Sequence, residues 1–243
     1  MKPKIAIPEP CSFDLEYSGR AFPPYLRAIE AAGGEPVVIP LNSSPEEIAR
    51  SAASCDAILL PGSRADVDPQ KYNAAKHPET AQADPLRDSA DELLLQDAYN
   101  LHKPVFGICY GLQSLNVWRT GTLVQHIESQ VNHSVGSKAG MCHAVTVAED
   151  SLLKEDVAGN QTVKAVPVNS SHHQSAEVVG DGLRAVAYCT DDNIIEAIEG
   201  TSPEHYVMAV QWHPERTYEQ DEFSNNLFKT FVEAARRWNG QHS

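Results

Sequence analysis

Four short apolar runs, separated by segments of helical character, fill the first half of the chain. They cover residues 4–8, 35–41, 56–62 and 103–109. Because their apolar positions are nearly continuous rather than alternating, we expect strands that are buried on both faces. Strands of this kind that alternate with helices are typical of a parallel sheet covered on both sides. The first half therefore predicts an α/β fold.

The segments between these runs carry helix signals. Residues 21–34 end at a pair of glycines, and residues 86–102 place leucines at helical spacing. At residues 44–54 the expected helix begins at Ser44, a good N-cap, which is followed by a proline and two acidic residues. A further helix is predicted at residues 111–119, directly after the fourth apolar run.

The second half of the chain has a different pattern. Short segments joined by turns are typical of antiparallel or mixed strands, and they cover residues 143–150, 162–166, 183–189, 193–199 and 206–212. A final helix is predicted at residues 222–238. Since no internal repeat, low-complexity tract or linker interrupts the chain, residues 1–243 are expected to form one domain.

Charge and cysteine content narrow the classes of protein. Lysine and arginine number 19 against 33 aspartates and glutamates, so the formal charge is −14. An acidic chain without a basic run is a poor partner for nucleic acid. No stretch approaches the roughly 20 apolar residues that cross a bilayer, and the N-terminus lacks the apolar core of a signal peptide. The five cysteines are scattered without CxxC pairs, which disfavours a disulfide framework. We therefore expect a cytoplasmic protein with neither nucleic-acid nor membrane partners.

Cys109 lies in Gly-Ile-Cys-Tyr-Gly, between the fourth apolar run and the helix predicted after it. This G-x-C-x-G pattern has the form of the G-x-S-x-G nucleophile elbow. The flanking glycines suit a sharp strand-to-helix turn that exposes the middle side chain at the carboxyl end of the sheet, where open α/β folds bind ligands. A helix N-terminus also favours a thiolate and offers N–H donors to an oxyanion. A buried structural cysteine is the alternative interpretation.

A thiol nucleophile needs a base, and the base needs an orienting acceptor. His213 directly follows a strand-like segment, and Glu215 is close enough in sequence to bind one ring nitrogen. The alternative is a surface histidine beside an unrelated acid. Most of the other histidines lie in polar loops and are expected to be solvated, among them His77, His126, His133 and His242.

His172 and His173 form a second histidine cluster. Adjacent residues point to opposite faces of a strand, or about 100° apart on a helix, so the two make a poor chelating pair. A metal site here would need distant ligands that the sequence does not identify. No metal is therefore expected.

Taken together, "PVFGICYGLQSLN" and "AVQWHPE" resemble the class I glutamine amidotransferases. Intervening segments resemble one branch, the peptidase C26 group that includes γ-glutamyl-γ-aminobutyrate hydrolases. They occur in the same order over almost the whole chain: "LLPGSRADVDPQKY", "DPLRDSADELLL", "GTLVQHI", "NSSHHQ" and "NIIEAIE". The resemblance implies a flavodoxin-like three-layer sandwich with a mostly parallel central sheet and a small mixed or antiparallel strand region.

The resemblance also implies roles for individual residues. Cys109 would attack the side-chain carbonyl of a γ-glutamyl amide, His213 would act as base and acid, and Glu215 would orient His213. The oxyanion would be bound by backbone N–H groups, one from Tyr110 and one from Ser63 or Gly62. Water would resolve the thioester without any cofactor, giving glutamate and an amine. Candidate substrate-binding residues are Gln113, Asn169, Ser170, Ser171, His172 and His173.

Departures from the family pattern leave the substrate open. Many members have two glycines where this chain has Gly62-Ser63, although a backbone donor survives that change. Arginine is frequent after the nucleophile in this branch, whereas this chain has Tyr110, which is common among synthetase-linked amidotransferases. Losing that cation changes how a substrate carboxylate would be held. Other candidates for that contact, each equally readable as a solvated surface residue, are Arg20, Arg64 and Arg119.

Three functions follow from this pattern. The favoured one is hydrolysis of small γ-glutamyl amides, in the manner of polyamine and putrescine catabolism. The second is a glutaminase subunit that delivers ammonia to a separate synthetase. The third is a non-catalytic binding protein on the same scaffold, which the retained Cys109, His213 and Glu215 disfavour. Dimers are common among such proteins, so a homodimer is a candidate assembly.

Overall fold

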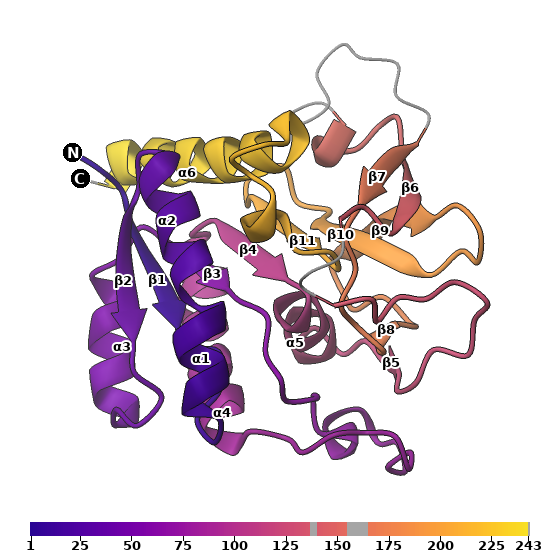
Figure 1. The fold of residues 1–243 in the computed structure, drawn as a ribbon. Coiled ribbons are helices and arrows are strands. Elements are labelled where there is room, and N and C mark those ends of the chain that lie inside the picture. Colours follow the sequence, from indigo (N-terminus) through magenta and orange to yellow (C-terminus); the bar gives the residue numbers. More distant parts are fainter. Residues whose placement is uncertain (137–139, 155–164, 243) are drawn as a thin grey trace.

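The computed structural model describes residues 1–136, 140–154 and 165–242, and a single large sheet runs through its centre (Figure 1). Within that part of the chain the sheet has nine strands in the order β2-β1-β3-β4-β11-β10-β9-β6-β7. Five neighbouring strands are parallel. They are β1 (Lys4–Pro8), β2 (Glu35–Ile39), β3 (Ala57–Leu60), β4 (Val105–Ile108) and β11 (Val207–Val210). The predicted parallel core of the α/β fold is confirmed.

The antiparallel strands of the second half extend this same sheet. The strand β10 pairs antiparallel with β11, and β9, β6 and β7 follow in turn. Their bounds are Ile195–Gly200 (β10), Leu183–Cys189 (β9), His143–Val147 (β6) and Val166–Val168 (β7). A separate ribbon pairs β5 (Leu123–Val124) with β8 (Ser175–Ala176). Residues 162–164 of the strand predicted at 162–166 lie outside the described ranges, and Val166 is the first residue of β7.

Helices cover both faces of the parallel half. One apolar cluster joins the sheet to α2 (Pro23–Ala31) and α6 (Glu222–His242), and a second joins it to α3 (Pro45–Ala53), α4 (Pro85–Leu101) and α5 (Tyr110–Trp118). The sequence did not predict α1 (Leu15–Ala21), a short helix without buried side chains. The sandwich is therefore the three-layer arrangement that the sequence predicted.

Local sequence explains where the elements begin. The Ser44 side chain accepts a hydrogen bond from the backbone of Glu47, and the Glu47 carboxylate accepts one from Ser44, so α3 begins with a full capping box. The loop after β3 contains one short 3-10 helix, Pro69–Tyr72, whose N-cap is Asp68.

None of the helices in the described ranges is long and apolar enough to cross a membrane.

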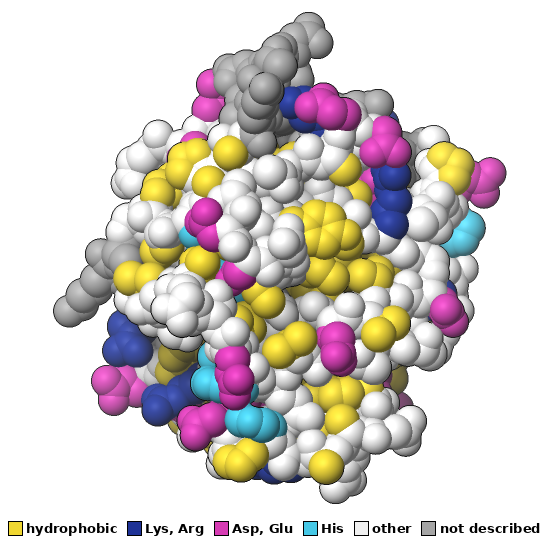
Figure 2. Space-filling model, turned by 90° about the vertical axis from the view of Figure 1, so that its right-hand side faces the viewer, with side chains coloured by type: hydrophobic (Ala, Val, Ile, Leu, Met, Phe, Trp, Pro, Cys, Tyr) yellow, Lys and Arg dark blue, Asp and Glu magenta, His cyan; other side chains and the backbone are white. Residues whose placement is uncertain are grey.

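The surface over the antiparallel end is mixed in character. Figure 2 shows hydrophobic side chains in separate patches there, with acidic, basic and histidine side chains between them. The strands β1 and β2 lie at the opposite end of the molecule, near both chain termini, and β4 and β11 lie between them and the antiparallel strands (Figure 1).

Candidate active site

Cys109 lies in the turn between β4 and α5, in a backbone conformation that non-glycine residues rarely adopt. Its φ is 54° and its ψ is −105°. The flanking glycines are required by close backbone contacts. A Cβ on Gly111 would lie 2.1 Å from the Leu60 carbonyl oxygen, and a Cβ on Gly107 would lie 2.9 Å from the Gly111 carbonyl. The sharp strand-to-helix turn predicted from G-x-C-x-G is therefore present. Strain of this kind is concentrated at functional sites.

His213 and Glu215 follow β11 and are both buried. Glu215 Oε1 lies 2.8 Å from His213 Nδ1, so this ring nitrogen donates a hydrogen bond to the carboxylate. The side chain of Asn169 holds the backbone of His213 from the other side, accepting from its N–H at 2.9 Å and donating to its carbonyl at 2.8 Å. The hydroxyl of Tyr25 lies 3.4 Å from the same Nδ1. The imidazole is thus fixed in position, with Nε2 left for chemistry.

Cys109 and His213 both lie against Gly62. A Cβ on this glycine would be 3.0 Å from His213 Cε1 and 3.7 Å from Cys109 Cβ. The two side chains line one cavity of about 390 Å³ together with Glu215. Its other walls come from α1, the loop after β3 and the segment before β8, and they include Tyr17, Arg20, Ser63, Asp66, Ser171, His173 and Arg216. The structure therefore brings the predicted thiol, imidazole and carboxylate to one cleft.

Burial determines the protonation of this cleft. It raises the pKa of the Cys109 thiol to about 12 and lowers the pKa of His213 below its ordinary value. Burial also acts to raise the pKa of Glu215, but attraction to His213 outweighs it and holds that pKa below its ordinary value. At neutral pH the thiol and the imidazole are therefore both neutral, and the carboxylate is ionised.

The sequence model of the peptidase C26 family matches residues 15–215. This chain belongs to that family. It is 32% identical over 220 residues to γ-glutamyl-γ-aminobutyrate hydrolase PuuD of Escherichia coli, covering 86% of this chain and 84% of the relative. It is 31% identical over 215 residues to protein NtpR of Enterococcus hirae, covering 86% and 87%. It is also 32% identical over 213 residues to the putative glutamine amidotransferase-like protein YvdE of Lactococcus lactis, covering 86% of each chain.

The fold agrees with this assignment. The crystal structure of a putative GMP synthase subunit from Thermoplasma acidophilum superposes with a TM-score of 0.65 over 100% of this chain and 98% of the other. The two sequences are 13% identical, so this likeness concerns the fold alone. The family and its relatives make this chain a glutamine amidotransferase-like hydrolase.

The backbone groups predicted to bind an oxyanion belong to Tyr110 and to Ser63 or Gly62. Burial raises the pKa of the Cys109 thiol, and the backbone of Tyr110, at the start of α5, acts in the opposite direction. Ser63 lines the cavity from the loop after β3. Gly62, the alternative to Ser63 in the sequence prediction, instead donates its N–H to the Tyr25 hydroxyl at 3.1 Å. The N–H of Gly62 is therefore already paired within the described residues.

Tyr110 lines the cavity, and its side chain is buried and bound to neighbouring charged groups. Its hydroxyl donates to Asp88 Oδ1 at 2.7 Å, and the guanidinium of Arg87 lies 4.8 Å from its ring centroid. The tyrosine that departs from the branch pattern is thus tied into a buried network.

The six predicted substrate-binding residues divide into two groups. Gln113, Ser171, His172 and His173 line the cavity. Asn169 binds the His213 backbone, and the Ser170 hydroxyl donates to the His133 carbonyl at 2.6 Å. Asn169 and Ser170 therefore bind backbone groups near the cavity and are not among its lining residues.

Arg216 is a cavity residue that the sequence analysis missed. Its Nη1 is buried without a hydrogen-bond partner among the described residues, and its Nε lies 3.4 Å from Glu215 Oε1. Arg20 and Arg64 line the same cavity, and Arg64 is also paired with Asp14. Arg119 lies elsewhere, donating to the Asp181 carbonyl at 2.7 Å. Its position in the sequence could have identified it, because Arg216 directly follows the His-Pro-Glu motif.

The prediction that His133 is solvated was wrong. Its side chain is buried between two carboxylates, with Nε2 2.9 Å from Asp192 Oδ2 and Nδ1 3.3 Å from Glu196 Oε1. Burial acts to lower the pKa of His133, but these two carboxylates outweigh it and raise that pKa. His77 and His126 are only partly exposed and stack on each other, while His242 is exposed.

Proposed function

We propose that this chain hydrolyses γ-glutamyl amides, releasing glutamate and an amine through a γ-glutamyl thioester on Cys109. One observation carries the proposal: a strained cysteine shares a cavity with a histidine whose Nδ1 is bound to a buried glutamate at 2.8 Å. The geometry is that of a nucleophile, a base and an orienting carboxylate. Family membership and the name of the PuuD relative agree with this reaction.

Acylation begins when the Cys109 sulfur attacks the γ-carbonyl carbon and His213 Nε2 takes the thiol proton. The oxyanion then accepts hydrogen bonds from the N–H groups of Tyr110 and Ser63, each worth roughly 3 to 4 kcal/mol of transition-state stabilisation. The C–N bond breaks, and His213 returns the proton to the leaving amine. Glu215 stabilises the imidazolium formed between these steps.

Deacylation repeats the sequence with water. His213 removes a proton from a water molecule, the hydroxyl attacks the thioester carbonyl, and the same two N–H groups bind the second oxyanion. The C–S bond then breaks and the sulfur regains its proton from His213. Free glutamate leaves with the water oxygen in its new γ-carboxylate.

The cavity carries both signs of charge, which suits the γ-glutamyl head. That group has an α-carboxylate and an α-ammonium at pH 7. Arg216 and Arg20 offer cations, and Arg216 has an unpartnered Nη1 among the described residues. Asp66 offers an anion in the same cavity, where it also pairs with His173 at 3.1 Å. A cavity of about 390 Å³ is at the small end of ligand sites, as a γ-glutamyl group with a short amine requires.

Glutamate release by the purified chain alone tests the proposal. The substrates are γ-glutamyl-γ-aminobutyrate, its α-glutamyl isomer and glutamine, with Cys109→Ala as the enzyme control. We expect turnover of the γ-linked compound, little of the α-linked isomer, and none by the variant. Equal turnover of both isomers would contradict recognition of the γ-glutamyl head.

A glutaminase subunit is the second candidate, and the same assay separates it. Such a protein would be weakly active alone on both γ-linked substrates. The sequence argument for it was Tyr110, but that side chain is bound to Asp88 rather than to the reacting groups. The position therefore gives this candidate little support.

A further inference from the structure

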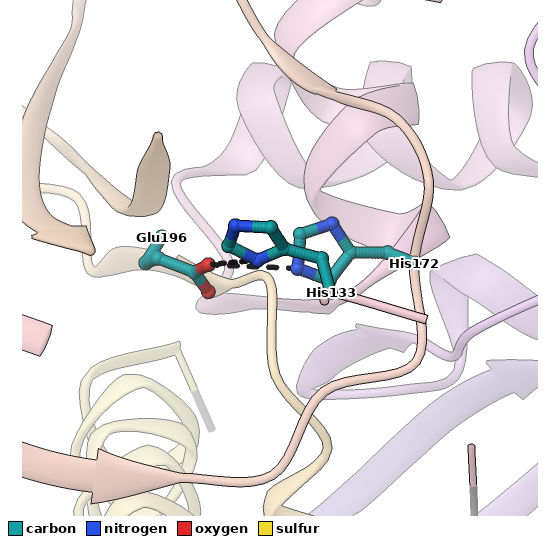
Figure 3. A group of neighbouring side chains, drawn as sticks. All are labelled: His133, His172 and Glu196. Atoms are coloured by element: carbon teal, nitrogen blue, oxygen red, sulfur yellow. Dashed lines mark ion pairs between the residues drawn. The ribbon is translucent and has the colours of Figure 1, made fainter. Parts of the chain in front are cut away.

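Three imidazoles converge on one oxygen of a buried carboxylate beside the candidate active site, and Figure 3 shows two of them. Glu196 on β10 is fully buried, and its Oε1 lies 3.0 Å from His143 Nε2, 3.3 Å from His133 Nδ1 and 3.5 Å from His172 Nε2. The pairing of β10 with β9 shifts register between Ile195 and Ala197, which makes Glu196 the extra residue of a bulge. Bulges redirect side chains, and this one directs a charge inward.

The outer nitrogens of two of these rings are already committed. His172 Nδ1 lies 2.9 Å from the Gln174 carbonyl oxygen and must donate to it, because a carbonyl only accepts. His133 Nε2 lies 2.9 Å from Asp192 Oδ2 and donates to that carboxylate. In the neutral tautomers that result, the lone pairs of His133 Nδ1 and His172 Nε2 face Glu196. Outer hydrogen bonds of this kind are what orient histidines that bind metals.

We propose that His133 Nδ1, His172 Nε2 and Glu196 Oε1 bind a divalent transition metal ion, with zinc as the expected occupant. These three atoms lie within 4.8 Å of one another. A tetrahedral zinc site with bonds of about 2.0–2.1 Å has ligand-to-ligand distances of about 3.3–3.4 Å. The nitrogen-to-oxygen distances of 3.3 and 3.5 Å match that geometry. Two imidazoles and a carboxylate form a donor set suited to zinc.

The unsatisfied polar atoms also point to a bound cation. Both Glu196 carboxylate oxygens, His133 Nδ1 and His172 Nε2 are buried without a hydrogen-bond partner among the described residues. A cation at their centre would satisfy all three side chains together. His143 is a positioning residue, because its Nε2 contacts the Glu196 oxygen while the ring packs edge-on against His133. The alternative to a metal ion is a proton on each ring nitrogen that faces Glu196.

The location gives the ion a structural role. It would tie the segment containing His133 and the segment containing His172 to the strand β10. The second of these segments also carries Asn169, which holds the His213 backbone, and Ser171, which lines the cavity. His172 itself borders the cavity, which supplies a route for the ion. The ion would support one wall of the cleft without entering the hydrolysis, so the inference stands apart from the proposed function.

Metal content is measured on the full chain carrying Cys109→Ser, so that the nucleophilic thiol cannot act as a ligand. The protein is stripped with EDTA, loaded with zinc, passed over a desalting column and analysed by mass spectrometry. We expect about one zinc per chain and a higher midpoint of thermal unfolding with zinc than with EDTA. Fewer than about 0.1 zinc per chain, at micromolar zinc during loading, would overturn the proposal.

Variants in the same background identify the ligands. Glu196→Gln and His172→Gln should each weaken zinc binding at least about tenfold, whereas His126→Gln, in the same loop as His133, should leave it unchanged. An alternative set within 4.8 Å comprises His133, Cys189 and Asp192. Loss of zinc in Cys189→Ser with retention in Glu196→Gln would assign the ion to that set and overturn ours.

Cobalt substitution tests the ligand assignment without any substitution in the cluster. Its result therefore does not depend on whether the cluster variants fold. Tetrahedral cobalt bound by nitrogen and oxygen gives visible absorption bands without a sulfur-to-cobalt charge-transfer band. That spectrum is expected for the Cys109→Ser chain. A charge-transfer band, or the pale spectrum of hydrated cobalt, would overturn the ligand assignment.

Discussion

The carboxylate of Glu215 accepts a hydrogen bond from His213 Nδ1 at 2.8 Å, inside a cleft where both groups are buried. This contact selects the tautomer that leaves Nε2 unprotonated, which is the form a general base requires. It also fixes the ring toward the cavity that Cys109 lines. Substitutions at this site and the pH dependence of its activity therefore test the proposed hydrolysis directly.

Cys109→Ala should abolish hydrolysis and leave the fold intact. The change removes one sulfur atom from a site whose turn is fixed by glycines rather than by the thiol. We expect glutamate release to fall at least about a thousandfold, with an unchanged circular dichroism spectrum. Residual turnover at the wild-type rate would reject Cys109 as the nucleophile.

His213→Ala should cost more than Glu215→Gln. Removal of the base eliminates proton transfer in both half-reactions, for an expected loss of about a thousandfold or more in kcat. The amide in Glu215→Gln still occupies the space but no longer stabilises the imidazolium, so a loss of about ten- to a hundredfold is expected. Steady-state kinetics of both variants checks the order. Equal losses would mean that the roles of the pair are misassigned.

The pH dependence follows from the direction of the His213 shift. Burial places the pKa of His213 below 6.5, so the imidazole is already neutral at pH 7. As the pH falls through that pKa the ring gains a proton and loses its function as base. We expect kcat/KM to be level just above pH 6.5 and to decline at lower pH.

Glu215→Gln supplies the control for this assignment. The carboxylate acts to raise the pKa of His213, so its removal should move the acid limb of kcat/KM to still lower pH. A limb that moves to higher pH, or does not move, would show that another group controls it.

Arg216→Gln should weaken recognition of the γ-glutamyl head. The buried Nη1 of this arginine has no hydrogen-bond partner among the described residues and lies at the cavity wall. Loss of a charged hydrogen bond to the substrate carboxylate is expected to lower kcat/KM about ten- to a hundredfold, mainly through KM. Arg119→Gln, whose side chain binds the Asp181 carbonyl instead, is the matched control and should change neither constant. Matching effects in the two variants would remove Arg216 from the substrate contacts.

Much of the fold could be predicted because its signals are local. The strand at residues 4–8 and the Ser44 cap depend on neighbours in sequence, and the structure has both. The turn at Cys109 was also predictable, since Gly107 and Gly111 directly indicate a crowded backbone. Contact between Glu215 and His213 required only that two nearby residues face each other.

The environment of His133 could not be predicted, because its partners are far along the chain. Asp192 and Glu196 are 59 and 63 residues away, and nothing periodic marks the loop that holds His133. Glu196 also lies in a strand whose alternation is broken by a bulge, so its inward direction depends on pairing with β9. The absence of a metal site was predicted from His172 and His173 alone, and that adjacent pair indeed does not act together. His172 turns to Glu196, while His173 turns to Asp66.

Gly111→Ala should destabilise the protein through the backbone contact that shapes the turn. The new Cβ would lie 2.1 Å from the Leu60 carbonyl oxygen and 2.8 Å from the Leu60 Cβ, and these atoms belong to the central sheet. We expect a loss of about 3 kcal/mol or more in the free energy of unfolding. For a chain of this size that corresponds to a fall in Tm of roughly 6–12 °C, measured by thermal denaturation.

Gly19→Ala is the matched control for that change. Gly19 lies in α1, and a Cβ there would meet nothing within 4 Å. Because alanine is the better helix former, Tm should stay the same or rise slightly. Similar falls in Tm for the two variants would mean that a general response to side-chain addition, and not contact with Leu60, explains the effect at Gly111. A fall confined to Gly111→Ala shows that the approach of α5 to β3 requires a glycine two residues after Cys109.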